Sequence, residues 1–289
     1  MWKKPVSLVL GGGGARGLAH IGVIKVLEAH KIPIKQIVGT SMGAVVGAVY
    51  AQYPDIALVE KKFRDLLDEK EYNTEKLYNG INKVAEGWLE HLSEQIKEHI
   101  TMNIAMFRES LFSAEKITRP LEHLLDATNI QDTKIPFTAV ATNLITGAPV
   151  HFKSGSIINA VACSASIPGF FPPRNYNNST LVDGAFCEPV PIPAAKKNMP
   201  HRKVIAVEVG GDLDQDPDID NSVDILLRSY KIAAMHYNTE LIKRADVLIQ
   251  PDVGAFHWSA FKEIDMFILR GEKAALDKLK QIKRTVRWL

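Results

Sequence analysis

One serine of the chain stands in a setting typical of a catalytic nucleophile. The stretch Gly39-Thr40-Ser41-Met42-Gly43 has the pattern G-x-S-x-G and leads into small, apolar residues from Met42 to Ala51. The pattern predicts a sharp turn from a strand into a helix, which exposes the Ser41 hydroxyl at the positive end of that helix. Gly39 and Gly43 are expected at such a turn, because a side chain at either position would collide with the neighbouring strand or helix. Since so short a pattern also occurs by chance, the assignment depends on the groups placed beside it.

A glycine-rich stretch from Gly11 to Gly17 comes earlier, between the apolar run Val6 to Leu10 and a predicted helix. Its G-x-G-x-x-G pattern falls on Gly12, Gly14 and Gly17. A cradle for a dinucleotide or a phosphate is one interpretation. Against it, the chain has no acidic residue at the end of a second strand about 20 residues further on, and no Gly-Lys-Ser/Thr. Bare backbone N–H groups of successive glycines are also able to hold the oxyanion of an acyl-transfer intermediate beside Ser41.

A serine nucleophile needs a base, and the chain offers two kinds of candidate. An order of serine, acid and then histidine is typical of α/β-hydrolases, and His257 is the histidine that lies late in the chain in a predicted loop. Asp183 is the better candidate, because it follows a short apolar strand and Gly184 lets the chain turn its carboxylate toward the site. Asp-Gly is also a common turn pair, so a purely structural turn is the alternative at this position.

Two later stretches complete a pattern with the glycine loop and the serine turn. The first is Ala165-Ser166-Ile167-Pro168 with its Phe-Phe-Pro-Pro continuation, and the second is Asp183-Gly184-Ala185. In order and spacing the four stretches resemble the patatin-like phospholipases, from Val6 to about Ile249. The resemblance implies a three-layer α/β/α fold and a Ser–Asp catalytic dyad without a triad histidine.

The resemblance also implies a role for each motif residue. Ser41 is the implied nucleophile and Asp183 the implied base, with Gly184 and Ala185 forming the turn beside it. The implied oxyanion hole consists of Gly12, Gly13 and Gly14, with Arg16 and Gly17 supporting that loop and Gly39 and Gly43 shaping the nucleophile turn. Partial burial near the loop from Phe170 to Pro173 is expected to make Asp183 a more effective base than an exposed carboxylate.

The order of predicted elements indicates an α/β protein. A strand, the glycine loop, a helix, a second strand and the serine turn make a β-α-β-α opening, which favours a mostly parallel central sheet with helices on both faces. No linker or repeat divides the 289 residues, so we expect a single domain over residues 1–289. Residues from about 54 to 130 form a charged, helical block, which is expected either to cap the site or only to pack on the sheet.

Composition narrows the classes of partner. A formal net charge of +2 gives no whole-molecule attraction to nucleic acid. Cys163 and Cys187 are expected to be free thiols in a reducing, cytoplasmic compartment. The alternating aspartates from Asp212 to Asp220 lack the glycine and the final glutamate of a calcium loop, so no metal is expected. No organic cofactor is expected either. The basic face of the last helix, from Glu263 onward, is either solvated or in peripheral contact with anionic lipid headgroups.

The sequence therefore predicts a serine lipid acyl hydrolase that cleaves carboxylic esters of phospholipids or lysophospholipids through an acyl-enzyme. The predicted partner is a lipid or acyl-ester substrate. Two competing hypotheses stay open at this point. The first is a Ser-His-Asp carboxylesterase or thioesterase, which would depend on a histidine such as His257. The second is a non-catalytic regulatory or nucleotide-binding module that uses the glycine loop.

Overall fold

A mostly parallel β-sheet runs through the computed structural model, which describes residues 3–68, 110, 112–211, 213, 219, 222–254, 256 and 259–287. Its strands are β1 (Val6–Leu10), β2 (Ile34–Thr40), β3 (Phe137–Asn143), β4 (Pro149–Phe152), β5 (Arg174–Tyr176), β6 (Ser179–Asp183), β7 (Lys203–Val207) and β8 (Val247–Ile249). The order across the sheet is β5-β6-β3-β2-β1-β7-β8, and β4 also pairs with β3. Strands β3, β2, β1, β7 and β8 run parallel, whereas β4, β5 and β6 are antiparallel to their neighbours. The predicted α/β class is confirmed.

The central strands are largely buried because both faces of the sheet are covered. All residues of β1 are buried, and successive side chains point to opposite faces. Leu8 and Leu10 join the larger hydrophobic core, while Val9 joins a smaller core on the other face. The predicted three-layer arrangement is therefore present, with layers of unequal thickness.

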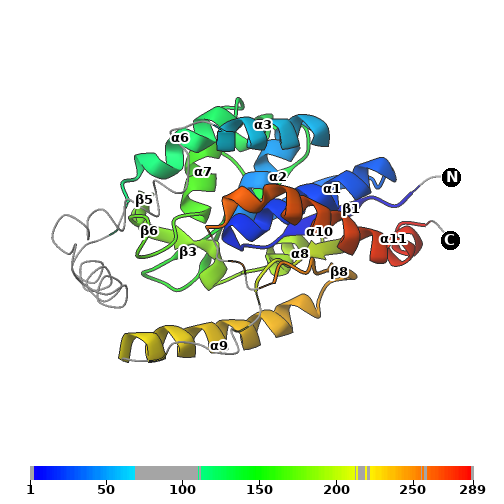
Figure 1. Cartoon of the computed structure of the whole chain (residues 1–289). Helices are drawn as coiled ribbons and strands as arrows, with labels where there is room; N and C mark the ends of the chain where they lie inside the picture. The colour runs from blue at the N-terminus through cyan, green and yellow to red at the C-terminus, as the bar shows by residue number, and fades with distance from the viewer. Residues whose placement is uncertain are drawn as a thin grey trace.

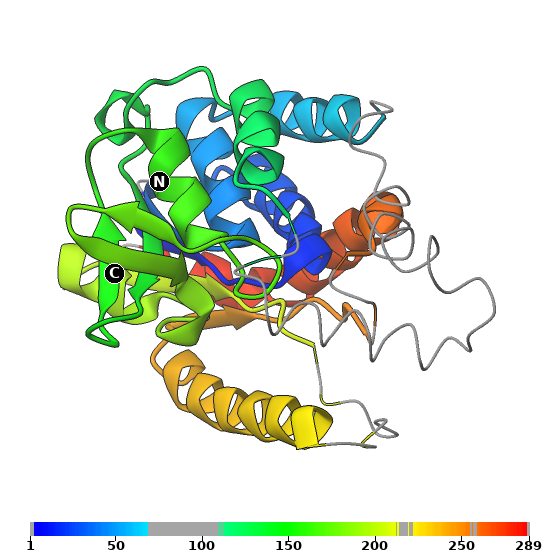
Figure 2. The same ribbon diagram turned by 90° about the vertical axis from the view of Figure 1, so that its left-hand side faces the viewer.

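The helices divide between the two faces accordingly (Figures 1 and 2). The larger core is covered by α1 (Ala19–Ala29), α2 (Met42–Gln52), α3 (Ile56–Asp68), α6 (Glu115–Leu124), α7 (Ile157–Ser164), α10 (Ile264–Asp277) and α11 (Leu279–Thr285). The smaller core is covered by α8 (Ile192–Asn198) and by residues at the carboxyl end of α9 (Ser222–Ile242). Most of α9 extends beside the body of the molecule. Among the described helices, none combines the length and apolar character needed to cross a bilayer.

The helical block is described only in part. Residues 69–109 and 111 lie outside the described residues, so the predicted cap is not tested, and the single-domain organisation over 1–289 also stays a prediction. The two described helices of the block, α3 and α6, pack against each other and against the layer formed by α1, α2 and α7. The segment after the gap returns to the loop that follows α7, where the Phe112 N–H donates to the Phe170 carbonyl at 2.9 Å.

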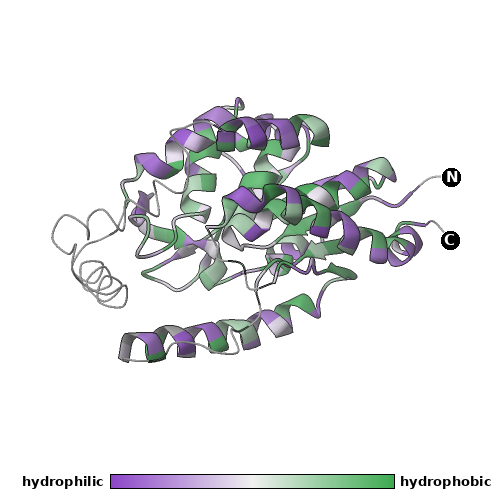
Figure 3. Cartoon of the chain, in the orientation of Figure 1, coloured by the Kyte–Doolittle hydropathy of each residue, from purple (hydrophilic) through white to green (hydrophobic). Residues whose placement is uncertain are grey.

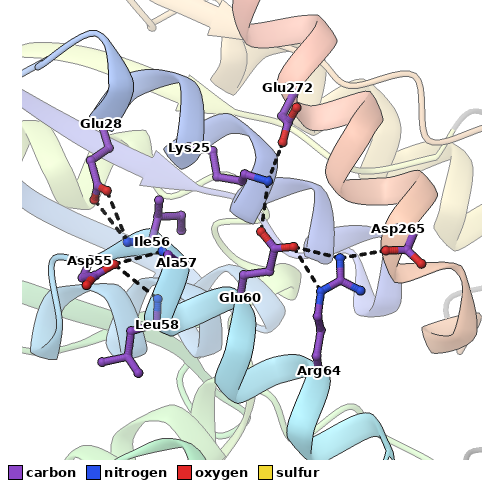
Figure 4. A network of polar contacts seen from close by, with 10 residues as sticks. All are labelled: Lys25, Glu28, Asp55, Ile56, Ala57, Leu58, Glu60, Arg64, Asp265 and Glu272. Carbon is purple, nitrogen blue, oxygen red and sulfur yellow. Dashed lines mark hydrogen bonds and ion pairs between the residues drawn. The ribbon is translucent and has the colours of Figure 1, made fainter.

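A network of charged side chains ties α3 to α1 and α10 (Figure 4). Glu60 of α3 accepts from Lys25 of α1 at 3.0 Å and from Arg64 at 2.8 Å. Lys25 also contacts Glu272 at 2.8 Å, and Arg64 contacts Asp265 at 2.7 Å, both on α10. Burial opposes the charge of Glu60, but the bonds from Arg64 and Lys25 outweigh it and lower the pKa of its carboxyl.

The start of α3 is satisfied by two more carboxylates of the same region. Asp55 accepts the backbone N–H groups of Ala57 at 3.0 Å and Leu58 at 3.3 Å, and Glu28 of α1 accepts that of Ile56 at 3.2 Å. These acceptors occupy N–H groups that have no partner within the helix, and their negative charge suits its positive end.

We expect Glu60→Gln to destabilise the fold by about 1–2 kcal/mol at pH 7, because it removes the charge shared by Lys25 and Arg64. Since the pKa of Glu60 is lowered in the folded state, this stabilisation is present above the unfolded pKa of about 4.3 and is lost as the pH falls through the lower folded value. Urea titrations from pH 7 to pH 3 measure the difference. Asp65→Asn, which removes the exposed pair with Lys61, is the matched control and should change stability by less than about 0.5 kcal/mol.

Candidate active site

The pairing of β3 brings the carboxyl ends of β2 and β6 together. Thr40 at the end of β2 pairs with Val140, and Asp183 at the end of β6 pairs with Ala141, the next residue of β3. The other edge of β3 is occupied by β4. Because β2 runs parallel to β3 and β6 antiparallel, the two strands lie along the same edge of β3 with their carboxyl ends facing each other. Ser41 and Asp183 therefore meet although they are far apart in the sequence.

Ser41 sits in the strained turn that the sequence predicted. Its backbone has φ 54° and ψ −127°, a conformation that L-residues rarely adopt, and it is followed at once by α2. The side chain makes no capping bond to the helix and is 5% exposed. A methyl group at Gly43 would lie 2.2 Å from the Leu10 carbonyl oxygen, which explains why only glycine fits there.

Asp183 is a buried carboxylate next to that serine. It is 2% exposed, and its Oδ1 accepts the Ala185 N–H at 2.8 Å. Its Oδ2 is buried without a formed hydrogen bond, and the neighbouring Ser41 side chain acts on the carboxyl as a donor that lowers its pKa. Burial is the larger influence and raises the pKa of Asp183 to about 6.

The glycine loop packs directly on the serine turn. A methyl group at Gly12 would lie 3.2 Å from the Cβ of Ser41. The Gly12 N–H, however, donates to the Pro189 carbonyl at 2.9 Å, so it is not free to hold an oxyanion and that expectation needs correction. For the N–H groups of Gly13 and Gly14 no acceptor is found among the described residues. Two of the three predicted donors thus stay available.

Arg16 links this loop to the end of the neighbouring strand. Its Nε donates to the Gly13 carbonyl at 3.2 Å. Burial lowers the pKa of the guanidinium, while the charge of Glu208, which follows β7, raises it. Gly17 is the other predicted support, and a methyl group there would lie 2.5 Å from the Met42 side chain. Arg16 thus bonds to the loop, and the absence of a side chain at Gly17 lets the loop pack closely against Met42.

Two histidines of the described residues, His20 and His151, contact groups other than Ser41 and Asp183. The Nε2 of buried His20 lies 2.8 Å from the Gly11 carbonyl, and burial lowers the pKa of its ring to about 4. His20 is therefore neutral at pH 7 and supports the start of the glycine loop. His151 contacts Glu188 at 3.1 Å. His257, the predicted triad candidate, lies outside the described residues.

The carboxyl end of α7 holds both functional turns, which the sequence analysis did not foresee. The Ser164 hydroxyl accepts the Ser41 N–H at 3.0 Å and donates to the Val140 carbonyl at 2.6 Å. Two residues later, the Ser166 carbonyl accepts the Asp183 N–H at 2.9 Å. In the sequence, the motif around Ser166 is identifiable only by its resemblance to the family. The structure adds that residues 164 and 166 bind the backbone N–H groups of Ser41 and Asp183, and so clamp the two turns together.

Two pairs of aromatic side chains lie in the segments that follow α7 and Asp183. Phe171 packs against the larger core with its ring 5.7 Å from that of Phe112. Phe186, which follows the Asp183 turn, stacks on Tyr230 of α9 with ring centroids 5.3 Å apart. Within the described residues, no group of three or more His, Cys, Asp or Glu side chains is placed to hold a metal ion.

Fold and site together define an α/β protein in which a serine turn faces a buried carboxylate beside a glycine loop. The family model of the patatin-like phospholipases matches residues 8–196, more than half of the chain. The chain belongs to the patatin-like phospholipase family.

Several relatives show how the chain compares with longer proteins. Lysophospholipase NTE1 of Meyerozyma guilliermondii is 30% identical over 218 residues, which are 74% of this chain and 13% of that protein. An uncharacterized NTE family protein of Mycobacterium bovis is 33% identical over 187 residues, 65% of this chain and 44% of that protein. The crystal structure of VipD from Legionella pneumophila aligns with a TM-score of 0.49 and 14% identity over 99% of this chain and 68% of that one. The chain thus spans less than half the length of these two sequence relatives.

We expect Ser164→Ala to lower the free energy of unfolding by about 1–3 kcal/mol, because it leaves the buried Ser41 N–H without its acceptor. Ser166→Ala is the matched control. It removes only a hydroxyl that donates to the Ala162 carbonyl, which also accepts the Ala165 N–H, and should cost less than about 1 kcal/mol. Equal losses in the two variants, measured by urea unfolding, would contradict the clamp.

Proposed function

We propose that the protein is a serine hydrolase of lipid carboxylic esters, with Ser41 as nucleophile and Asp183 as base. The observation that supports this most directly is the meeting of β2 and β6 on β3, which sets a serine in a strained turn against a carboxylate that is 2% exposed. Family membership and the lysophospholipase name of a relative support lipid esters as the substrate class.

The proposed reaction has two halves that use the same groups. Asp183 takes the proton of the Ser41 hydroxyl as its oxygen attacks the ester carbonyl carbon. The N–H groups of Gly13 and Gly14 hold the negative oxygen of the tetrahedral intermediate. Collapse of this intermediate breaks the ester bond, and the leaving alcohol or lysolipid takes the proton from Asp183. Water then attacks the acyl-enzyme, again with Asp183 as base, and releases the fatty acid and free Ser41.

The raised pKa explains how an aspartate can serve as the base. A carboxylate of ordinary pKa, about 4, is a poor proton acceptor at neutral pH. Burial raises the pKa of Asp183 to about 6, so the group is still ionised at pH 7 but binds a proton more strongly when the serine gives it up. The burial that costs stability thus contributes to reactivity.

Fluorophosphonate labelling tests the assignment of the nucleophile. Wild type should be labelled and Ser41→Ala should not, while a phospholipid and its lyso form offered in parallel identify the preferred ester. Labelling that persists in Ser41→Ala, or a wild type that is never labelled and binds nucleotide, would favour the non-catalytic alternative. Loss of turnover in His257→Ala would favour the Ser-His-Asp alternative.

The pH profile follows from the carboxyl of Asp183. Because the base must be ionised, kcat/KM on a soluble ester is expected to rise with pH, to reach half its maximum near the pKa of about 6, and then to level off. A profile that is flat between pH 5 and pH 8, on protein shown to be folded throughout, would exclude Asp183 as the base.

Asp183→Asn should separate activity from stability. It removes the base and is expected to lower turnover by about 100-fold or more. It should also raise the melting temperature at pH 8, because the wild type there carries a buried charge that the amide lacks. Since the folded pKa is raised above the unfolded one, the wild type regains this stability as the pH falls below about 6, so the two proteins should converge toward pH 4. Calorimetry at both pH values measures the effect, and a variant less stable than wild type at pH 8 would contradict it.

A further inference from the structure

Large apolar side chains are exposed on three elements next to the proposed catalytic turn. They are Leu144 (51% exposed) and Ile145 (75%) between β3 and β4, Phe186 (41%) after Asp183, and Leu226 (69%) and Tyr230 (45%) on α9. We call these five residues the apolar rim. Side chains of this kind and exposure, gathered beside one site, are typical of a surface that is covered in function.

Contacts between the three elements make the rim continuous. Phe186 and Tyr230 stack with an interplanar angle of 29°. The Cys187 thiol, one residue after Phe186, donates to the Gly147 carbonyl in the turn that carries Ile145, at 3.1 Å. The rim also adjoins the Asp183 turn, since Phe186 follows Asp183 by three residues and stacks on Tyr230. In keeping with this position, the pKa of Tyr230 is raised to about 12, first by burial and then by the charge of Asp183.

Helix α9 holds its apolar stripe away from the protein core. At its carboxyl end Leu241 is 3% exposed and packs on the body, whereas Tyr237 is 47% and Leu226 69% exposed on the same side of the helix. Figures 1 and 2 show α9 extending beside the body, and Figure 3 shows apolar residues along it. A helix of 21 residues that leaves such side chains in water needs a further apolar partner to bury them.

We propose that the apolar rim is the surface by which the protein docks on a lipid aggregate. This inference rests on the proposed function, because the rim borders the turn that carries Asp183. A second copy seated there would cover the turn that carries Asp183, whereas a lipid surface would bring an ester substrate to that turn. Tyrosine, with an apolar ring and a polar hydroxyl, suits the boundary between acyl chains and water.

The charges around α9 indicate neutral rather than anionic lipids. The sequence before α9 carries Asp212, Asp214, Asp216, Asp218 and Asp220, and Asp224 follows in the first turn of the helix. Against these, the amino-terminal half of α9 offers Arg228 and Lys231. Docking should therefore depend on apolar burial, and added salt or anionic lipid should not strengthen it.

Vesicle binding with matched variants tests the rim. Wild type should sediment with phosphatidylcholine vesicles, and Leu226→Gln and Ile145→Gln should each lower the vesicle partition coefficient about tenfold or more. Leu269→Gln is the matched control, since Leu269 is 66% exposed on α10, on the opposite layer of the molecule, and should bind as wild type does. Two rim variants from separate elements keep the test valid if one of them folds poorly.

The outcomes separate docking from catalysis. Failure of wild type to bind vesicles, or rim variants that bind as well as wild type, would overturn the inference. It is likewise overturned if light scattering shows a wild-type dimer that Leu226→Gln converts to a monomer, because the rim would then be an interface between copies. Fluorophosphonate labelling of Ser41 is measured in the same samples. Rim-dependent binding without labelling would reject the proposed function and leave the docking surface standing.

Discussion

The register of β3 is the constraint on which the site depends. One edge of β3 pairs with β2 up to Val140 and with β6 from Ala141 onward, and this register determines that Thr40 and Asp183 lie next to each other. No local preference of the Ser41 turn or of the Asp183 turn would bring them together. A shift of β6 by one residue would turn the carboxylate to the other face of the sheet, because side chains alternate along a strand. The geometry of the candidate site is thus a consequence of strand pairing.

That geometry buries the polar groups of Ser41 and Asp183, so their backbone N–H groups need hydrogen-bond partners inside the protein. Ser41 and Asp183 each have a backbone N–H held by the end of α7, through the Ser164 hydroxyl and the Ser166 carbonyl. Among the described residues, Oδ1 of the carboxylate accepts the Ala185 N–H, whereas Oδ2 is buried without a formed hydrogen bond, and Ser41 is the other donor that acts on this carboxyl. A carboxylate fully satisfied by backbone donors would be more stable and a weaker base. Burial, together with incomplete satisfaction by donors, accounts for the raised pKa of Asp183.

Local patterns predicted the parts of the molecule that depend on neighbouring residues. The strained turn at Ser41 and the apolar run of β1 follow from steric limits and burial, so the sequence sufficed for both. Contacts between distant segments were out of reach. Nothing in the glycine loop shows that Pro189 occupies the N–H of Gly12, and nothing near Ser164 shows that its hydroxyl accepts from Ser41. These bonds exist because strands far apart in the chain become neighbours.

The two helical layers differ in thickness, and this difference determines which part of the fold stays exposed. The thick layer contains α1, α2 and α10 and carries the ion network around Glu60, which joins α3 to α1 and α10. The thin layer offers only α8 and the carboxyl end of α9, so most of α9 has no protein surface to cover it. That uncovered length includes Tyr230, which stacks on Phe186, three residues after Asp183 in the sequence. The least covered part of the molecule therefore reaches the turn that carries Asp183.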